Sequence, residues 1–274
     1  MKTNAAALIG LFVIFTVGFG CKSLSNMLPK AGTEFVIQIE TNEADKQAIV
    51  QRAIKITDNK INAMALDGHV KIDTDDQNRM IVRVYGASDL ERAKKFLFTS
   101  YQMELRKVIS PPNPMPLQTY PLEETAKKIA TGEQEVLLFT ERSDPTDSEQ
   151  TDSSKKFVIV EKSAIVNGDD IRDAKAFSSY GKRDDYNQYQ ISFSLKPNAA
   201  ARFGDWTGRN INNYIAVVLN NKVQSAAFIK SQIFDSGEIN GRFTKIQAED
   251  IAMSLKSGYL PATMRIIDEK KIGN

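Results

Sequence analysis

The order of hydrophobic patterns in the first half of the chain constrains its fold most strongly. Residues 34–40 (EFVIQIE) alternate apolar and polar side chains, which predicts a strand with one buried face. Apolar residues then recur at helical spacing, for example at Ile49, Ala53 and Ile56. The full series is strand, helix, two strands, helix and strand, predicted at residues 34–40, 43–66, 69–73, 79–86, 88–98 and 101–109. This order is typical of the split βαβ, or ferredoxin-like, arrangement.

A proline-rich segment separates this pattern from the rest of the chain. Residues 110–121 hold five prolines among twelve residues, and proline cannot donate a hydrogen bond to a strand ladder. We interpret this segment as a connector into a second unit. Residues 142–156 are acidic and then basic, without a large apolar side chain, which predicts a loop between strands at 135–141 and 155–162.

The second half of the chain predicts a further α+β unit. Two apolar strands flank Asn220 and Asn221, and an asparagine pair suits a two-residue hairpin because asparagine tolerates positive φ. Another strand is predicted at 189–196 and a closing helix at 247–258. We therefore predict an α+β protein of two lobes, a ferredoxin-like base with an inserted α+β head.

The N-terminus carries a different signal. Residues 5–20 form an uncharged apolar run after Lys2, which is typical of a signal peptide or a short membrane anchor rather than of a buried soluble helix. Cys21 follows a glycine, as in lipoproteins that are acylated on such a cysteine, although Gly18 and Phe19 depart from that pattern. Lipidation of Cys21, an uncleaved anchor and ordinary cleavage all stay open. Each places the body outside the cytoplasm, because Lys2 holds the short N-terminal tail inside.

Composition argues against several classes of function. The formal net charge is +2, so the strongly basic face of a nucleic-acid-binding protein is not expected. One cysteine and one histidine support neither a disulfide framework nor a histidine-rich metal site nor a histidine-relayed nucleophile. The acidic pair Asp169 and Asp170 fits a helix N-terminus better than a metal site, with Asp169 as the cap and Asp170 favoured by the helix dipole. We expect no catalytic residue, metal, cofactor or nucleic-acid partner, and hence no enzyme.

Several segments resemble a known family, in the order and near the spacing found there. The clearest are NGDDIRDAKA, YQISFSLKPNAAARFGDWT, IAVVLNNKVQSA, GEINGRFTKIQAEDIAMSLKSGYLPA and MRIIDEKKIG. They resemble the large first extracytoplasmic domain of SecD, an accessory subunit of the bacterial Sec protein-export machinery, and the resemblance covers about residues 34–274. SecD-like proteins continue into transmembrane helices that carry proton-linked chemistry. No second apolar run of about twenty residues occurs in this sequence, so we expect it to lack that chemistry.

The resemblance implies a base near the membrane and a mobile head. The implied parts are a signal peptide or anchor, a tether, a base in two segments and a head, at residues 1–21, 22–33, 34–110 with 246–274, and 111–245. The two hinge strands would be the proline-rich segment and the turn near Phe243 and Thr244, since two connections between lobes permit hinge motion.

The resemblance also implies that the head holds unfolded polypeptide. Unfolded chains offer unpaired backbone groups and apolar side chains, which edge strands and apolar clefts bind with little sequence preference. The strands at 189–196 and within 214–229 could present such an edge or groove. Candidates for its apolar lining, each of which could instead be a core residue, are Phe193, Val218, Phe228, Ile229 and Phe234.

Two functions follow as hypotheses. The first is an accessory to protein export, anchored in the cell envelope at the periplasmic face of a bacterial membrane, that binds unfolded or secreted polypeptides and acts with Sec translocase components. The alternative is an envelope lipoprotein that uses the same fold as a scaffold for a partner unrelated to translocation, because a fold does not fix a function.

Overall fold

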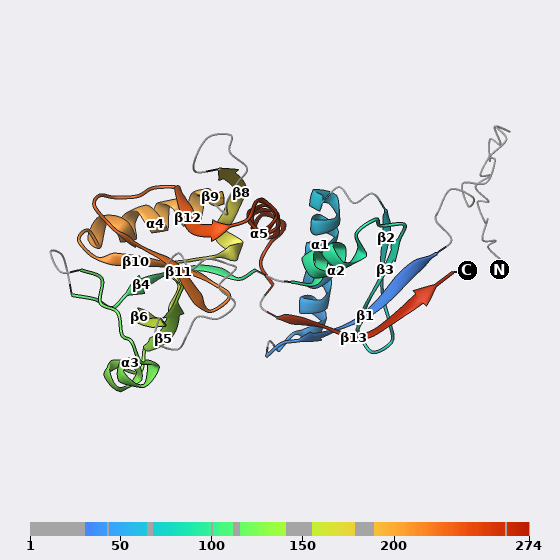
Figure 1. Ribbon diagram of the computed structural model, residues 1–274, viewed down its shortest axis with the longest axis horizontal. Coiled ribbons are helices and arrows are strands. Elements are labelled where there is room, and N and C mark those ends of the chain that lie inside the picture. The colour runs from blue at the N-terminus through green and yellow to red at the C-terminus, as the bar shows by residue number, and fades with distance from the viewer. Residues whose placement is uncertain are drawn as a thin grey trace, which may run out of the picture.

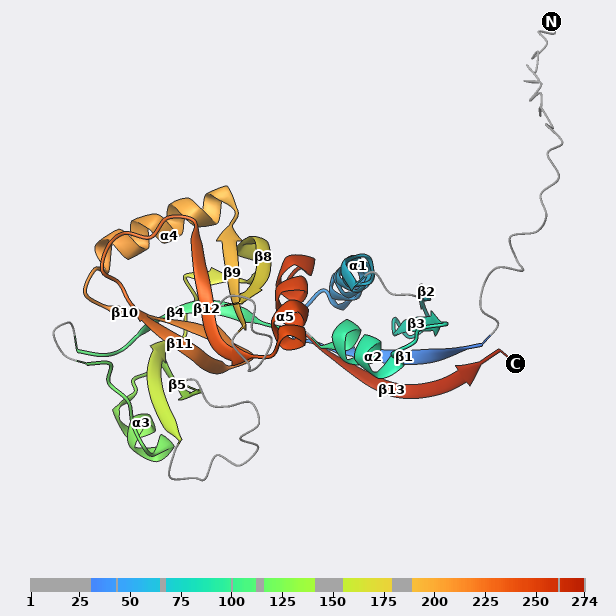
Figure 2. The same cartoon turned by 45° about the horizontal axis from the view of Figure 1, so that its top comes forward.

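Two lobes lie side by side in the computed structural model, with one helix between them (Figures 1 and 2). The structure describes residues 31–42, 44–64, 68–99, 101–111, 116–140, 155–178, 189–260 and 262–273. In this described part, no helix has both the length and the apolar character needed to cross a membrane. The apolar run, Cys21 and most of the predicted tether lie outside the described residues.

The base is a four-stranded antiparallel sheet with two helices on one face. Its strand order is β13-β1-β3-β2. Alternate residues of β1 point to the helices, and Phe35 and Ile37 are fully buried there beside Phe96 of α2. The elements are β1 (Gly32–Glu40), α1 (Lys46–Met64), β2 (His69–Thr74), β3 (Met80–Tyr85), α2 (Leu90–Phe98) and β13 (Thr263–Ile272).

The fourth strand of the base differs from the sequence prediction. The predicted strand at 101–109 forms as β4 (Met103–Val108), but it pairs within the head, and β13 takes its place beside β1. The physical reason is burial. Met103 and Leu105 on one face of β4 and Val108 on the other are all buried, whereas β13 leaves most of its side chains exposed. A strand with buried residues on both faces suits an interior position, and one with an open face suits the base.

The head contains a sheet that closes on itself. Its strand order is β10-β11-β5-β6-β4-β7, and an additional β10–β4 pairing joins β4, β6, β5, β11 and β10 into a ring. The ring is filled by apolar side chains that include Phe139, Val158 and Val218. The new elements are α3 (Glu123–Ile129), β5 (Gln134–Phe139), β6 (Lys156–Glu161), β7 (Val166–Asn167), β10 (Tyr214–Leu219) and β11 (Lys222–Phe228).

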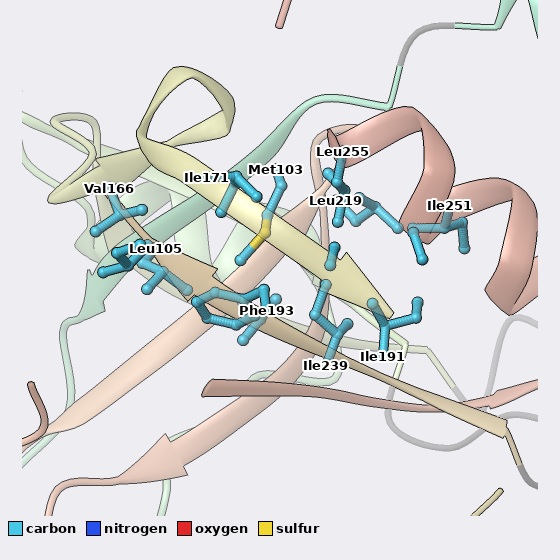
Figure 3. Close-up of a cluster of buried hydrophobic side chains, with 14 of the residues drawn as sticks. Met103, Leu105, Val166, Ile171, Ile191, Phe193, Leu219, Ile239, Ile251 and Leu255 are labelled. Atoms are coloured by element: carbon cyan, nitrogen blue, oxygen red, sulfur yellow. The ribbon is translucent and has the colours of Figure 1, made fainter. Parts of the chain in front are cut away.

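A second, three-stranded sheet completes the head. Its order is β12-β9-β8, and it packs against the outer face of β4 and β10 (Figure 3). Strand β10 is buried on both faces because Val217 points to this sheet and Val218 into the ring. Asn220 and Asn221 form the predicted hairpin with φ of 50° and 59°. The elements are η3 (Gly168–Asp170), β8 (Ile171–Ser178), β9 (Tyr189–Leu195), α4 (Pro197–Arg209) and β12 (Ser236–Phe243).

Helix α5 (Lys245–Ser257) lies between the lobes but belongs mainly to the head. Ile251 and Leu255 are buried in the head core, while Met253 packs against the base core. The segment 246–274, predicted to be part of the base, is therefore divided between the two lobes. The separate sheets confirm the predicted α+β protein of two lobes. The division of this segment and the placement of β4 give boundaries between the lobes that differ from the predicted ones.

The connections between lobes also differ from those predicted. The chain leaves the base between α2 and β4, at residues 99–102, and returns between α5 and β13, at 258–262. Phe243 instead packs against the head core. Tyr120, at the end of the proline-rich segment, forms a β-bridge with Phe157 of the head. Both predicted hinge segments thus lie within the head.

The separate cores predict that a cavity in the base weakens the base selectively. Ile37→Ala removes a fully buried side chain and should lower the free energy of unfolding by about 2–5 kcal/mol. The control Ile267→Ala, on the exposed side of β13, should change it by less than about 1 kcal/mol. Circular dichroism during chemical denaturation measures the whole chain, and fluorescence of the single Trp206, in α4, measures the head. Equal effects of the two variants would contradict this account of the base core.

Candidate functional site at the joint and on the head

Arg52 of α1 fastens the base to the head. Its Nε donates a hydrogen bond to the carbonyl oxygen of Tyr259 at 2.8 Å, and its guanidinium forms an ion pair with Asp169 of η3. Two turns further along α1, Asn59 Nδ2 donates to the carbonyl oxygen of Ser257 at 2.9 Å. Arg52 and Asn59 lie on one side of the helix because they are about two turns apart. This side of α1 therefore holds the end of α5 and the turn that follows it through polar contacts.

The turn after α5 depends on two glycines. Gly258 has φ 119° and ψ 166°, a backbone conformation that is essentially restricted to glycine. Gly168 allows η3 to approach Tyr259, since a Cβ at Gly168 would lie 2.9 Å from the Cβ of Tyr259. The sequence thus sets the path by which the chain returns to the base.

The acidic pair before β8 lies at the start of a short 3-10 helix, η3, but the N-cap is Asn167 rather than the predicted Asp169. Asn167 is the N-cap: its side chain accepts a hydrogen bond from the backbone N–H of Asp169 at 2.9 Å, and its own N–H donates to Asp170 Oδ2 at 3.0 Å. Asp170 also forms an ion pair with Arg202 at 2.8 Å. Asp169 is left facing Arg52 of the base. Among the described residues, no group of three or more His, Cys, Asp or Glu side chains is placed to hold a metal ion.

Lys60 lies buried beneath the first connection between the lobes. Its side chain is 1% exposed, and its ammonium donates hydrogen bonds to the carbonyl oxygens of Phe96, Leu97 and Thr99 at 3.1, 3.4 and 2.5 Å. These carbonyls belong to the C-terminal end of α2, where unpaired acceptors collect. Burial lowers the pKa of Lys60 to about 8. The residue was not singled out from the sequence, because nothing in its neighbourhood distinguishes it from the exposed lysines of the same helix.

The predicted apolar lining is distributed through the head rather than gathered on one surface. Phe193, Val218 and Ile229 are 4%, 1% and 0% exposed, and Figure 3 shows Phe193 within the cluster between the head sheets. Phe228 is half-buried against Tyr214, with ring centroids 5.4 Å apart. Phe234 is 64% exposed. Of these five candidates, only Phe234 presents most of its side chain to solvent.

Phe234 is held in place by helix α4. In the segment that leads to β12, the Ile233 N–H donates to Thr207 Oγ1 at 3.0 Å, and that hydroxyl donates to the Ile233 carbonyl oxygen at 2.9 Å. Gln232 Nε2 donates to the carbonyl oxygen of Gly204 at 3.1 Å. The neighbours of Phe234 in sequence are therefore fixed while its ring stays outside. Phe234 was selected from the sequence as a candidate lining residue, but its exposure could not be predicted there.

The strand edges also differ from those considered in the sequence. Strand β9 is central in its sheet, and β10 lies between β4 and β11. In the described chain, β11 has a second ladder partner, β5, only at Lys222 and Val223. The edges of the three-stranded sheet are β8 and β12. Backbone groups for an added strand are thus offered by β8, β12 and the second half of β11.

The fold and its joint define a class of protein: a base-and-head module, with the head inserted before the last strand of the base. Residues 143–262 match the family model of the SecDF P1 head subdomain. The protein translocase subunit SecD of Aquifex aeolicus is 31% identical over 228 residues, which cover 83% of this chain and 40% of that protein. SecD of Elusimicrobium minutum is 28% identical over 257 residues, covering 89% of this chain and 52% of that protein. The chain is a homologue of the P1 base-and-head region of SecD and SecDF.

Solved structures show the same fold. SecDF in a super-membrane-facing form superposes with a TM-score of 0.63 at 23% identity, covering 88% of this chain and 30% of that chain. A second structure, of a SecDF membrane component that enhances protein export, gives 0.60 at 22% identity and covers 86% and 98%. The chain spans about half or less of the length of the two SecD relatives compared above. These relatives are translocase subunits, which confirms the prediction that the chain is not an enzyme.

The buried ammonium predicts a specific dependence of stability on pH. The pKa of Lys60 is about 8 in the folded protein and near its ordinary 10.5 in the unfolded chain, so between these values the unfolded state holds the extra proton. The free energy of unfolding should therefore rise with pH from about 8 to 10.5, by about 3 kcal/mol at most. Lys60→Met should lose this rise in denaturation curves measured across the window. Lys55→Met, an exposed position on the same helix, should keep it, and identical slopes in both variants would refute the assignment.

Proposed function

We propose that this chain is a SecD-like accessory to protein export that binds unfolded polypeptide through its head on the periplasmic side of a bacterial membrane. Its similarity to translocase subunits supports the export setting. The two-lobed fold supports a head that moves on a base, because two connections join the lobes and the joint combines the packing of Met253 with polar contacts of Arg52 and Asn59.

The observation that carries the proposal is the exposed ring of Phe234. A large aromatic side chain on a segment pinned to α4 offers apolar surface that loses little freedom when it is covered. Strand β12 begins directly after it, at Ser236, and is a sheet edge. An extended polypeptide could pair with this edge while an apolar side chain packs on Phe234. Such contacts select for disorder rather than for one sequence, as an export accessory requires.

The proposal predicts that Phe234→Ala weakens binding of unfolded protein without unfolding the head. The probe is a reduced, carboxymethylated protein carrying a fluorophore, titrated with the full chain and followed by anisotropy. Truncation of a central aromatic contact should cost about 1–2 kcal/mol, or roughly 5–30-fold in affinity. Leu122→Ala is the matched control, since Leu122 is 63% exposed elsewhere on the head.

The outcomes separate the two functions under consideration. Saturable binding that depends on Phe234 and not on Leu122 supports the export role. If the wild-type chain fails to bind the probe at any concentration, the export proposal falls. A native envelope partner recovered by crosslinking in that case would favour the alternative, a scaffold unrelated to translocation.

The anchor is a separate part of the proposal. Lipidation at Cys21 would tether the body to the membrane, since a thioether-linked lipid together with a further acyl chain binds a bilayer stably where a single chain does not. Cells that express the chain and are fed a labelled fatty acid should yield labelled protein, and Cys21→Ala should abolish the label. Label that persists in the variant would rule out this attachment, and membrane association without any label would favour an uncleaved anchor.

A further inference from the structure

A cleft of ≈ 380 Å³ opens between the two lobes where α1 faces the start of β8 and the end of α5. Its walls come from separate parts of the chain: α1 belongs to the base, and η3, β8 and α4 belong to the head. The turn Gly258–Tyr259, which carries the chain back to the base, forms part of the lining. Anything bound in this cleft touches both lobes and the connection between them.

The charge of the lining is strongly one-sided. Among the described residues that form it, five are cationic and one is a carboxylate: Arg52, Lys55, Arg172, Lys196, Lys256 and Asp169. Lys256 also forms an ion pair with Asp173, just outside the lining, at 3.0 Å. With both carboxylates counted, five cations and two anions leave a formal charge of about +3, in a protein of net charge +2, which concentrates a positive potential between low-dielectric walls. Two of the cations stand on the base and three on the head. Their mutual repulsion acts to separate the lobes.

The acceptors in the cleft are already engaged by protein donors. Arg52 pairs with the Asp169 carboxylate and donates to the carbonyl oxygen of Tyr259. Asn59 occupies the carbonyl oxygen of Ser257, and Lys196 Nζ donates to the carbonyl oxygen of Asp169 at 2.6 Å. Outside the lining, Lys256 pairs with Asp173 at 3.0 Å and Arg172 Nε donates to Ser194 Oγ at 3.4 Å. The five cations still outnumber the two carboxylates, Asp169 and Asp173. A bound anion would offset the excess positive charge of the lining.

Helix α4 adds to the same field. Lys196 is its N-cap residue and makes no side-chain capping bond, and the first turn of this 13-residue helix carries no acidic residue. The positive end of the helix dipole accordingly meets the cationic side chains at the cleft. Two of these side chains, Arg52 and Arg172, carry planar guanidinium groups that suit the paired oxygens of a phosphate.

We infer that the cleft binds a phosphate group and that its binding draws the base and the head together. A phosphate carries more than one negative charge and several oxygens, so it can accept hydrogen bonds from both walls at once and replace repulsion across the joint by attraction. The group can belong to free inorganic phosphate or to the headgroup of an anionic phospholipid. This inference does not rest on polypeptide binding by the head and stands or falls separately.

Calorimetric titration of the full chain at low ionic strength tests the site with two probes, inorganic phosphate and short-chain phosphatidylglycerol. The double variant Lys55→Gln, Arg172→Gln removes one cation from each wall and should weaken binding of the effective probe by at least about tenfold. The matched control is Lys222→Gln, Lys230→Gln, two exposed lysines of the head outside the cleft, and it should change affinity by less than about twofold. The distance between fluorophores placed on base and head should shorten when the probe binds, and the double variant should not show this change.

The titrations distinguish between the two sources of the phosphate group and can also refute the site. Binding of inorganic phosphate identifies a free phosphate site, and binding of the lipid alone identifies a headgroup site. Equal affinity in the double variant and its control would overturn the inference, as would saturation without any change in the interlobe distance. Binding of an acidic peptide with no response to either phosphate probe would also overturn it. Loss of unfolded-protein binding in Phe234→Ala with retained phosphate binding would show that the two sites are independent.

Discussion

The ladder between β1 and β13 is the constraint on which the rest of the architecture depends. It joins the first described strand to the last, so the base is complete only when the chain returns from the head. Both connections between the lobes must then leave the same base, one after α2 and one before β13. A head attached in this way can turn about the line through its two connections but cannot drift away. The inserted topology is therefore compatible with hinge motion and does not require a flexible linker.

Local patterns predicted the elements better than their partners. The alternation around Phe35 and Ile37 and the positive φ of Asn220 are properties of short stretches, and the structure contains them as predicted. The partner of β4 could not be predicted in this way, because β10 lies far along the chain and either sheet would accept an apolar strand. The prolines of residues 110–121 correctly indicated a break in regular structure. They did not indicate where the chain changes lobes, since a break within one lobe has the same composition.

For the candidate site too, the sequence indicated local properties of residues but not their tertiary surroundings. High β-propensity selected Phe193, Val218 and Ile229 together with Phe234, but exposure depends on which faces the other sheets cover, and that is a property of the whole fold. The interlobe cleft had no sequence signal at all, because Arg52, Arg172 and Lys256 come from three distant elements. At the joint, Asp169 offsets part of that charge and Arg52 fixes the returning chain. Arg52 and Asp169 thus determine how the lobes contact each other, and they also line the cleft in which a bound phosphate would change that contact.

Two of the strand pairings that close the ring of the head are short. Strand β11 meets β5 in register only at Lys222 and Val223, and β4 meets β6 at Val108, while the β5–β6 pair itself is laddered over six residues. A hairpin that is well bonded internally and sparsely bonded to its neighbours is a cooperative unit for sub-global opening. Amide hydrogen exchange in β5 and β6 would then proceed by the two strands separating from the ring together, with α3 attached. Each opening would expose Lys222 and Val223, the part of the β11 edge that β5 covers, and so extend the open edge along the whole strand.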